Sequence, residues 1–300
     1  MYKKAYCILA HKNPVQIKEL ITLLDDNNSV FFVHLDKKVN QIEFQRLLEN
    51  TPSHFVKNRI SCSWGKYSLV QATLNSMKEV QKFMDFNYKN SDYHFILLSG
   101  EDLPLKSNTF IHDFLKSKAK TSFINYWELP YKKWWGGGLF RFENFYFFEY
   151  KKNPGLNYWA NKIIKKINLK SLLPMNRFKK QFPDFKIYGA SQWMLLNNEM
   201  ISFILETNNA NKKFNSIFKY VLAPDELYFA TLILNYDREK QFPIDNLETH
   251  LVCFSGAEAS PKYLEVEDLE INKNDLLFAR KFDSDVNQES IDKVKKIIAQ

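Results

Sequence analysis

The sequence predicts an α/β fold in which a mostly parallel central sheet is flanked by helices. In the first half of the chain, short apolar runs typical of buried strands alternate with segments whose apolar residues recur at helical spacing. That alternation favours a parallel sheet covered on both faces. A chain of 300 residues can bury a sizeable core, and it contains neither an internal repeat nor a clear linker, so we expect a single domain over residues 1–300.

Turn and cap residues set the boundaries of the first elements. Asn13 and Pro14 follow the first strand, and proline favours a helix start because it lacks an N–H that would stay unpaired there. Asp36 ends the second strand, and Pro104 closes the turn after the fourth. The predicted strands span residues 5–10, 30–35, 60–64, 93–98 and 122–127, and the helices span 15–24, 68–84 and 108–116.

The second half has a different pattern. Residues 128–184 are rich in aromatic residues and prolines and contain the run Gly136–Gly138, which predicts loops and helices built over the sheet. We expect a strand with its turn at 186–197, a helix at 199–206 and a last helix at 288–298.

Polar and aromatic residues stand where several predicted strands end. His11, Asp36, Trp64 and the run Ser99–Asp102 each follow a different apolar run. In open parallel sheets, ligands bind beyond the carboxyl ends of the strands. The shared location predicts one site formed by these residues.

The stretch Ala223–Glu226 precedes the apolar run 227–234 and predicts a helix start. Asp225 and Glu226 would then lie in the first turn, near the positive end of the helix dipole. A carboxylate that stays ionised near neutral pH is suited to act as a general base. The simpler interpretation is that acidic residues are common in a first turn.

The charge and aromatic content of the chain indicate which kinds of partner it can bind. The net charge is +8 and the pI is about 9.1, which indicates an anionic partner such as a phosphorylated donor or an acidic membrane surface. The basic residues are scattered as short pairs without a nucleic-acid-binding signature, so we expect no nucleic acid partner. The aromatic share of 16% fits carbohydrate or nucleotide handling, although core packing accounts for most of it.

Cysteine content and the N-terminus suggest a compartment. Cys7 and Cys62 lie in apolar runs, which predicts buried free thiols and a reducing environment. Met1 leads into a strand-like segment without the apolar region of a signal peptide, and no apolar stretch is long enough to cross a bilayer. We therefore expect a cytoplasmic protein.

Several classes of catalytic motif are absent from the sequence. There is no dinucleotide-binding or P-loop glycine pattern, no nucleophile elbow and no clustered His or Cys ligands. Asp283 and Asp285 form the only Asp-x-Asp pair that could hold a metal on a diphosphate, and they lie near the C-terminus. Without a metal ion, side-chain cations must stabilise a leaving diphosphate, and Arg280 and Lys281 suit that role.

Seven segments, in order, resemble the core-2/I-branching glycosyltransferases, a family that also includes the xylosyltransferases. The resemblance covers nearly the whole chain, although residues 128–184 match least. The segments are Ala5–Lys12, Val33–Asp36, Trp64–Leu74, Leu97–Lys106, Gly189–Trp193, Pro224–Glu226 and Leu277–Asp283.

The resemblance implies a GT-A-like glycosyltransferase fold and an inverting enzyme that needs no metal ion or other cofactor. Residues 1–127 would form the nucleotide-binding half, and residues 128–300 the acceptor-binding and catalytic half. Glu226 would be the catalytic base. The donor would be bound by His11, Asp36, Trp64, His250, Arg280 and Lys281. The transferred sugar or the acceptor would be bound by Ser99, Glu101, Asp102, Glu128, Trp193 and Asp225.

The expected reaction moves a sugar from a UDP-sugar to a glycan hydroxyl and gives a β-linkage. N-acetylglucosamine, as in the β-1,6-N-acetylglucosaminyltransferases, is the first expectation for the sugar, with glucose or xylose as alternatives. Heavy use of Lys, Asn, Ile and Phe is typical of a bacterial source. The acceptor would then be a lipid-linked or lipopolysaccharide glycan in surface polysaccharide synthesis, with peripheral contact to anionic lipid at the inner face of the cytoplasmic membrane.

Two other functions remain open from the sequence. A glycoside hydrolase also uses two carboxylates, but Asp225 and Glu226 are adjacent and would diverge on a helix, so Asp102 or Glu101 would have to be the partner. A non-catalytic protein that binds carbohydrate or a membrane surface would also explain the aromatic and basic residues.

Overall fold

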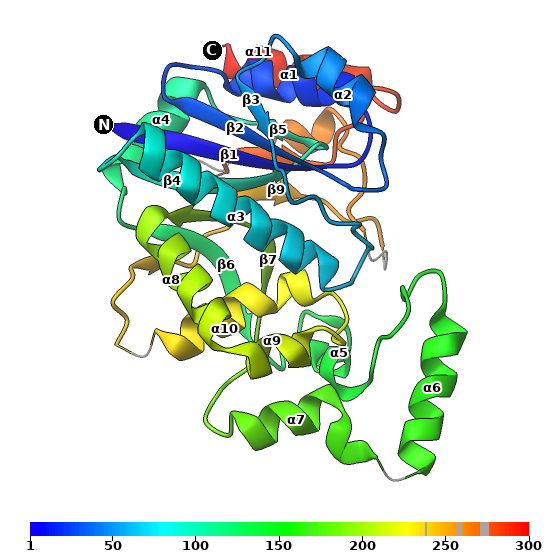
Figure 1. The fold of residues 1–300 in the computed structure, drawn as a ribbon. Helices are drawn as coiled ribbons and strands as arrows, with labels where there is room; N and C mark the ends of the chain where they lie inside the picture. The colour runs from blue at the N-terminus through cyan, green and yellow to red at the C-terminus, as the bar shows by residue number, and fades with distance from the viewer. Residues whose placement is uncertain (168, 238, 257–259, 271–275, 300) are drawn as a thin grey trace.

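A seven-stranded sheet forms the centre of the molecule (Figure 1). The computed structural model describes residues 1–300 except 168, 238, 257–259, 271–275 and 300. Across the sheet, the strands run in the order β3 (Ser53–Phe55), β2 (Ser29–Leu35), β1 (Tyr2–Ala10), β4 (Asp92–Ser99), β7 (Tyr188–Asn197), β6 (Ser122–Glu128) and β8 (Ile244–Asp245). The strands from β3 to β4 are parallel, whereas β7 is antiparallel to both of its neighbours.

A small second sheet brings the C-terminal part of the chain to the end of β4. Its order is β5 (Asp102–Pro104), β10 (Phe278–Arg280) and β9 (His250–Val252). In the antiparallel register of β5 and β10, Arg280 lies opposite Asp102. Because β5 follows β4 directly, this pairing places Arg280 beside one of the predicted site segments.

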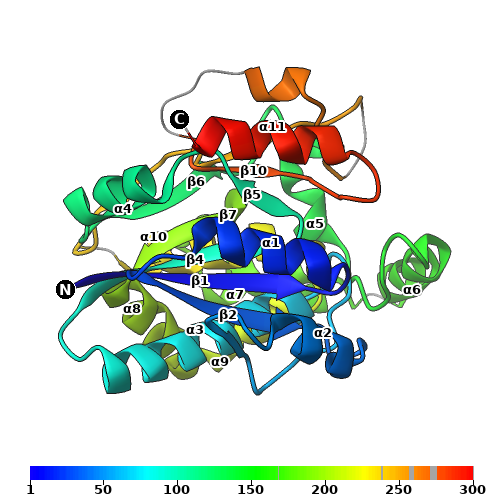
Figure 2. The same cartoon turned by 90° about the horizontal axis from the view of Figure 1, so that it is seen from above.

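Helices cover both faces of the large sheet (Figures 1 and 2). One face carries α1 (Pro14–Leu24), α2 (Gln41–Leu48), α4 (Asn108–Ser117) and α11 (Gln288–Ile298), which share one buried core with Tyr6 and Ile8 of β1. The other carries α3 (Ser68–Asn87), α8 (Asn198–Ala210), α9 (Lys212–Phe218) and α10 (Tyr228–Tyr236), whose core includes Ala5 and Cys7. Alternate residues of β1 thus point to opposite cores, as strand geometry requires.

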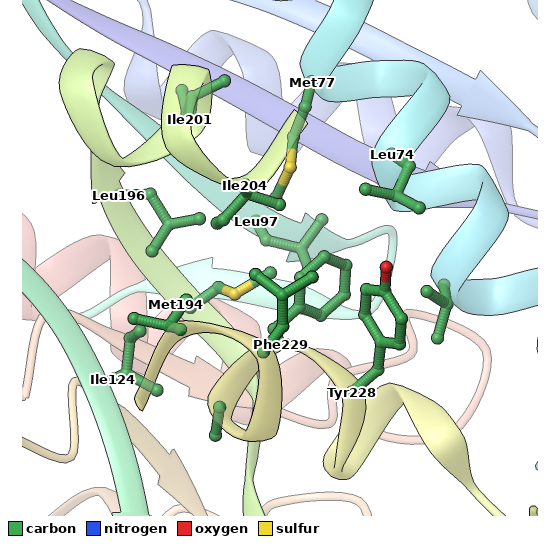
Figure 3. Close-up of a cluster of buried hydrophobic side chains, with 14 of the residues drawn as sticks. Leu74, Met77, Leu97, Ile124, Met194, Leu196, Ile201, Ile204, Tyr228 and Phe229 are labelled. Atoms are coloured by element: carbon green, nitrogen blue, oxygen red, sulfur yellow. The ribbon is translucent and has the colours of Figure 1, made fainter. Parts of the chain in front are cut away.

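The core behind the sheet is built from long apolar side chains of three helices (Figure 3). Met77 of α3, Ile204 of α8 and Phe229 of α10 meet Leu97 and Met194 of the sheet, and all five are buried. This packing fixes α10 and the turn that precedes it.

The remaining short elements lie between β6 and β7 or in the last third of the chain. They are η1 (Trp135–Gly138), α5 (Phe140–Glu143), α6 (Pro154–Lys166), η2 (Lys170–Leu172), α7 (Pro174–Gln181), η3 (Pro224–Glu226) and η4 (Glu267–Glu270). Within the described residues, no helix combines the length and the apolar character that a membrane span requires.

The predicted fold class is confirmed: a mixed α/β structure with a mostly parallel sheet flanked by helices, as in a GT-A-like fold. The last helix has the predicted bounds, and the other predicted helices and strands are present, except for the strand at 60–64.

The prediction of a strand at 60–64 is wrong, because the third strand is β3. The backbone N–H groups of this segment bind side chains instead of a neighbouring strand. The N–H of Ile60 donates to Nε2 of His34 at 3.1 Å, and the N–H of Cys62 donates to a carboxylate oxygen of Asp36 at 3.3 Å. Cys62 is only partly buried, whereas Cys7 is fully buried, and both are free thiols.

The expected helix start at Pro224 is also corrected. Pro224–Glu226 form a 3₁₀ turn, and Leu227, with φ −131° and ψ −38°, separates this turn from α10. Asp225 and Glu226 therefore precede the α-helix and do not form its first turn.

The Tyr228 hydroxyl anchors α10 against α8 and α9. It lies 3.0 Å from Oδ1 of Asn208 and 2.7 Å from Oδ1 of Asn215, and all three residues are buried. We expect Tyr228→Phe to lower the free energy of unfolding by about 1–3 kcal/mol, because buried acceptors lose their donor. Urea denaturation measures this change. Tyr220→Phe at a partly exposed ring is the control, and equal stability of the two variants would contradict the anchoring role.

Candidate active site

The ends of β1, β2 and β4 are joined by backbone hydrogen bonds. The N–H of Asp36 donates to the carbonyl of Ala10 at 2.8 Å, and the N–H of Gly100 donates to the carbonyl of Leu9 at 3.1 Å. His11, next in the chain, lies in the electrostatic field of Asp36, Glu101, Lys12 and Lys281. The ends of these three strands therefore lie side by side. Trp64, which the sequence pattern places at a strand end, follows no strand in the structure.

Asp36 organises the loop that carries Cys62. One carboxylate oxygen accepts the N–H of Lys38 at 2.8 Å, and the other accepts the N–H of Cys62 at 3.3 Å. The ammonium of Lys38 lies 3.5 Å from the same carboxylate. Asp36 is buried, so these donors offset the loss of hydration of its charge.

Asp102 is fully buried at the start of β5. Its carboxylate accepts hydrogen bonds from the N–H of Ser99 at 2.8 Å and from the Ser99 hydroxyl at 2.7 Å. Nε of Arg280 lies 3.3 Å from the carboxylate. Burial raises the pKa of Asp102, while the charge of Arg280 and the Ser99 hydrogen bonds oppose that shift.

Arg280 also stacks on Trp193. The guanidinium carbon lies 4.0 Å from the centroid of the Trp193 ring, and the Trp193 ring in turn lies 6.0 Å from the ring of His250. His250 is buried, and burial followed by the charge of Arg280 lowers its pKa to about 3. His250 is therefore neutral and contributes no positive charge to a donor site.

Lys281, Lys12 and two acids form a charged group beside this stack. Glu101 lies 2.8 Å from the ammonium of Lys12 and 3.6 Å from that of Lys281. Burial lowers the pKa of Lys281 first, and the like charges of Arg280 and Lys12 lower it further, against the effect of Glu101. A bound anion at this position would relieve that crowding of cations.

Asp283 is the second acid of this charged group and holds Lys12 in place. One of its carboxylate oxygens lies 2.7 Å from the ammonium of Lys12, and the other accepts from the Asn13 amide at 3.3 Å and from the N–H of Asp285 at 3.1 Å. Asp283, the first acid of the Asp-x-Asp pair, is thus engaged in holding the residues before α1 to the C-terminal region. Among the described residues, no three His, Cys, Asp or Glu side chains are arranged to hold a metal ion.

The turn with Glu226 is joined to the Trp64 loop. Ala223, whose φ of 47° and ψ of 57° place it in the left-handed region, donates its N–H to the carbonyl of Gly65 at 3.0 Å. Trp64 packs against Ala223 and Tyr146, and the ammonium of Lys151 lies 4.2 Å from a Trp64 ring centroid.

The two carboxylates of the turn have different surroundings. Glu226 is 37% exposed in its side chain and forms an ion pair with Arg141 at 2.5 Å between Nη1 and Oε2. Asp225 is 8% exposed, and its buried Oδ1 has no hydrogen-bond partner within the described structure. Burial, and then the charge of Glu226, raises the pKa of Asp225 to about 7.

Cys62 connects this turn to the strand ends. Burial first, and then the charges of Asp36 and Asp225, raise the pKa of the Cys62 thiol to about 12, against the effect of Lys38. The thiol therefore lies within the electrostatic range of both carboxylates. The turn that carries Glu226 also packs against β7 and α3. Its Ala223 bonds to Gly65, three residues after Cys62, and Cys62 donates to Asp36 at the end of β2, which links the turn to the converging strand ends.

Glu128 has its ion-pair partner outside these groups. It is the last residue of β6, and its carboxylate forms an exposed ion pair with Lys186 at 2.8 Å. Trp193, Ser99, Glu101 and Asp102 belong to the Arg280–Lys281 group, whereas Asp225, Glu226 and Trp64 form a second group.

The structure adds residues that the sequence reasoning missed. Arg141 holds Glu226, and its guanidinium carbon lies 4.1 Å from a ring centroid of Trp134. Tyr263 donates its hydroxyl to Glu101 at 3.2 Å. Lys12 follows His11 at a strand end, so the strand-end rule could have identified it. No local signal marks Arg141 or Tyr263, because their partners lie far away in the sequence.

Chemically, the arrangement offers one partly exposed carboxylate oriented by an arginine and one group of partly buried cations. The ion pair with Arg141 uses Oε2 of Glu226, which leaves Oε1 to accept a proton. Two cations with restricted exposure, Arg280 and Lys281, suit an anionic group better than a neutral one.

Comparison with known proteins identifies the family. A sequence model of the Core-2/I-Branching enzyme family matches residues 4–275. Xylosyltransferase 2 of Mus musculus is 24% identical over 319 residues, which cover 96% of this chain and 33% of the relative. Xylosyltransferase 1 of Homo sapiens is 24% identical over 311 residues, covering 96% and 29%, and a xylosyltransferase of Ciona intestinalis is 22% identical over 309 residues, covering 95% and 33%.

The chain thus spans about a third of the length of these relatives. The family match extends from β1 through the turn that carries Glu226, and it includes most of the residues assembled at the strand ends. The protein belongs to the Core-2/I-Branching enzyme family.

Proposed function

We propose that this chain is a glycosyltransferase that moves a sugar from a UDP-sugar to a hydroxyl of an acceptor glycan. Family membership and the xylosyltransferase relatives support the transfer of a sugar. The observation that carries the proposal is the position of Glu226: a partly exposed carboxylate held by Arg141 at the edge where the strand ends converge.

In the proposed reaction, Glu226 takes the proton of the acceptor hydroxyl. The oxygen then attacks the anomeric carbon as the bond from that carbon to the diphosphate breaks, so UDP leaves with the bonding electron pair. In-line attack inverts the configuration and gives a β-linkage from an α-linked donor. Arg141 would keep Oε1 of Glu226 directed toward the acceptor, and Arg280 with Lys281 would stabilise the charge on UDP.

The donor and acceptor roles of the other residues are proposed on the same basis. Asp36 and Trp64 would bind the nucleoside, with His11 close to both the nucleoside and the phosphates. Buried, neutral His250 would act indirectly, by supporting the Trp193 ring on which Arg280 stacks.

Ser99, Glu101 and Asp102 would border the transferred sugar, and Asp225 would support Glu226. Exposed Glu128 would contact a distant part of the acceptor.

N-acetylglucosamine, xylose and glucose are the donor sugars that we propose to test, because the relatives are named xylosyltransferases and the family is that of the branching enzymes. A lipid-linked or lipopolysaccharide glycan at the inner face of a bacterial cytoplasmic membrane is the proposed acceptor. The net positive charge supports contact with that surface.

A glycoside hydrolase is less well supported. Asp225 is buried and Glu226 is partly exposed, so these two carboxylates do not face each other across an open site. Release of free sugar from a glycan without any nucleotide would favour the hydrolase. Glycan affinity without a thermal shift from UDP would favour a non-catalytic binding protein.

Replacement of the proposed base tests the mechanism directly. We expect Glu226→Gln to lower kcat by roughly two to four orders of magnitude, because the amide cannot take the proton. UDP binding, measured by thermal shift, should be unchanged. Glu143→Gln removes an exposed carboxylate close to Arg141 in sequence and is the matched control. Wild-type turnover in Glu226→Gln would rule out the assigned role.

Replacement of the proposed phosphate cation tests the donor site. We expect Lys281→Met to weaken UDP binding by about 10- to 100-fold, since hydrogen bonds to charged groups contribute about 1.5–3 kcal/mol. Isothermal titration calorimetry measures the change. Lys82→Met removes an exposed lysine of α3 and should bind UDP as the wild type does. Equal affinity in both variants would contradict the assignment.

Chelation tests the proposal that no metal ion takes part. Sugar transfer should continue in excess EDTA at the rate seen without it, because fixed cations would stabilise the leaving UDP. Transfer is measured as UDP released in the presence of acceptor. Complete loss in EDTA, followed by recovery with Mn²⁺, would overturn this part of the mechanism.

A further inference from the structure

Helix α6 projects from the body of the molecule in both views (Figures 1 and 2). Its polarity is the reverse of that expected for a helix on a protein surface, which normally turns its apolar side inward. The buried residues of α6 are Asn157 and Asn161. Leu156, Trp159 and Ile163 are each more than half exposed.

The two asparagines hold this orientation through paired hydrogen bonds. The Asn161 amide bonds to both the N–H and the carbonyl of Phe145, each at 2.7 Å. The Asn157 amide bonds to both the N–H and the carbonyl of Phe148, each at 3.1 Å. Because these amides satisfy backbone groups of the segment below, α6 cannot turn its apolar side inward without losing four hydrogen bonds.

The exposed side chains form a continuous stripe. Leu156, Trp159, Ile163 and Ile167 follow the spacing i, i+3, i+7 and i+11, which places them on one side of a helix. Ile167 caps the helix and is also more than half exposed. We call these four residues the apolar stripe.

Positive charge lies along one side of the stripe. Residues 150–183 contain no Asp or Glu, so the excess charge of this segment accounts for all of the net charge of +8 and leaves the rest of the chain close to neutral. Lys162 and Lys166 border the stripe, and the ammonium of Lys162 lies 4.7 Å from a ring centroid of Trp159. The basic residues of the segment are Lys151, Lys152, Lys162, Lys165, Lys166, Lys170, Arg177, Lys179 and Lys180.

We propose that α6 docks this protein on an anionic lipid bilayer, with the apolar stripe inserted among the headgroups and the lysines against lipid phosphates. A helix with Trp, Leu and Ile on one side and lysines beside them has the composition of helices that lie in the membrane interface. Charge complementarity selects the occupant, since a second copy of this chain would bring an equally basic segment against the first.

The docking surface is connected to the candidate active site. Phe145 and Phe148, which bind α6, flank Tyr146 and Phe147, whose carbonyls accept hydrogen bonds from Lys66 next to the Trp64 loop. Lys151, just before α6, lies over the Trp64 ring. A docked α6 would therefore hold the site near the bilayer surface; that a lipid-linked acceptor is presented there rests on the proposed function.

Vesicle sedimentation tests the proposal without any donor or acceptor. The probe is a vesicle of equal parts phosphatidylglycerol and phosphatidylcholine, with pure phosphatidylcholine as the uncharged comparison. We expect wild-type protein to sediment with the anionic vesicles only, and less as salt is raised. Lys162→Gln with Lys166→Gln should weaken binding by roughly tenfold or more, because each lysine near an anionic bilayer contributes to the binding free energy. Lys78→Gln with Lys82→Gln, at the same i, i+4 spacing on exposed positions of α3, should bind as the wild type does.

The apolar part is tested by Trp159→Ser with Ile163→Ser, which should lower binding to the same vesicles at least tenfold. Ile42→Ser with Phe86→Ser removes exposed apolar side chains elsewhere and is the matched control. Both pairs should keep the wild-type unfolding midpoint, since all four side chains are mostly exposed.

Equal binding by the stripe variant and its control would overturn the proposal. A second result would also overturn it: wild-type protein does not bind the vesicles but self-associates, and the stripe variant does not self-associate. That result would show that the stripe binds a second copy of the chain. Glu226→Gln should bind vesicles normally, so failure of docking and failure of the proposed catalysis are separate results.

Discussion

The ion pair between Asp102 and Arg280 is the contact on which the candidate site depends. It joins the end of β4 to the C-terminal part of the chain, and the register of β5 and β10 places the two residues opposite each other. Asp102 is fully buried and its ionised form is disfavoured there, so its stability depends on Arg280 and the two Ser99 hydrogen bonds. Arg280 in turn fixes the place of Lys281 beside Glu101. Removing either partner would leave a charge buried without its counterion.

The two carboxylates near the expected chemistry differ because their surroundings differ. Asp225 is enclosed and its pKa is raised to about 7, whereas Glu226 reaches solvent and is held by Arg141. A pair of this kind separates roles: the enclosed acid supports the turn, and the accessible one can exchange a proton with a ligand. The left-handed backbone at Ala223 and its hydrogen bond to Gly65 produce this separation by turning the chain sharply before Pro224.

Much of the fold follows from local patterns in the sequence, since strands buried on both faces and helices with an apolar side carry their own signals. The segment 60–64 shows where this fails: its apolar residues favour a strand, but His34 and Asp36 capture its backbone donors through tertiary contacts. The strand-end rule singled out Asp36 and Ser99–Asp102. The predicted helix start singled out Glu226, the need for cations at a leaving diphosphate singled out Arg280 and Lys281, and the resemblance gave these residues their proposed roles. The role of Arg141 could not be predicted from the sequence, because it depends on the packing of residues 128–184 against a turn more than eighty residues later.

The same region explains why polarity alone is a poor guide to the inner side of α6. A pattern-based prediction would turn Leu156, Trp159 and Ile163 inward, but the segment beneath the helix presents backbone N–H and carbonyl groups of Phe145 and Phe148, which bond to asparagines of α6. Asparagine amides satisfy a donor and an acceptor together, which an apolar side chain cannot do. Burying those backbone groups unpaired would cost about 1–3 kcal/mol each, which offsets the gain from covering the stripe. The stripe therefore stays exposed for a structural reason, and the lysines beside it make an anionic bilayer the partner that satisfies both its apolar surface and its charge.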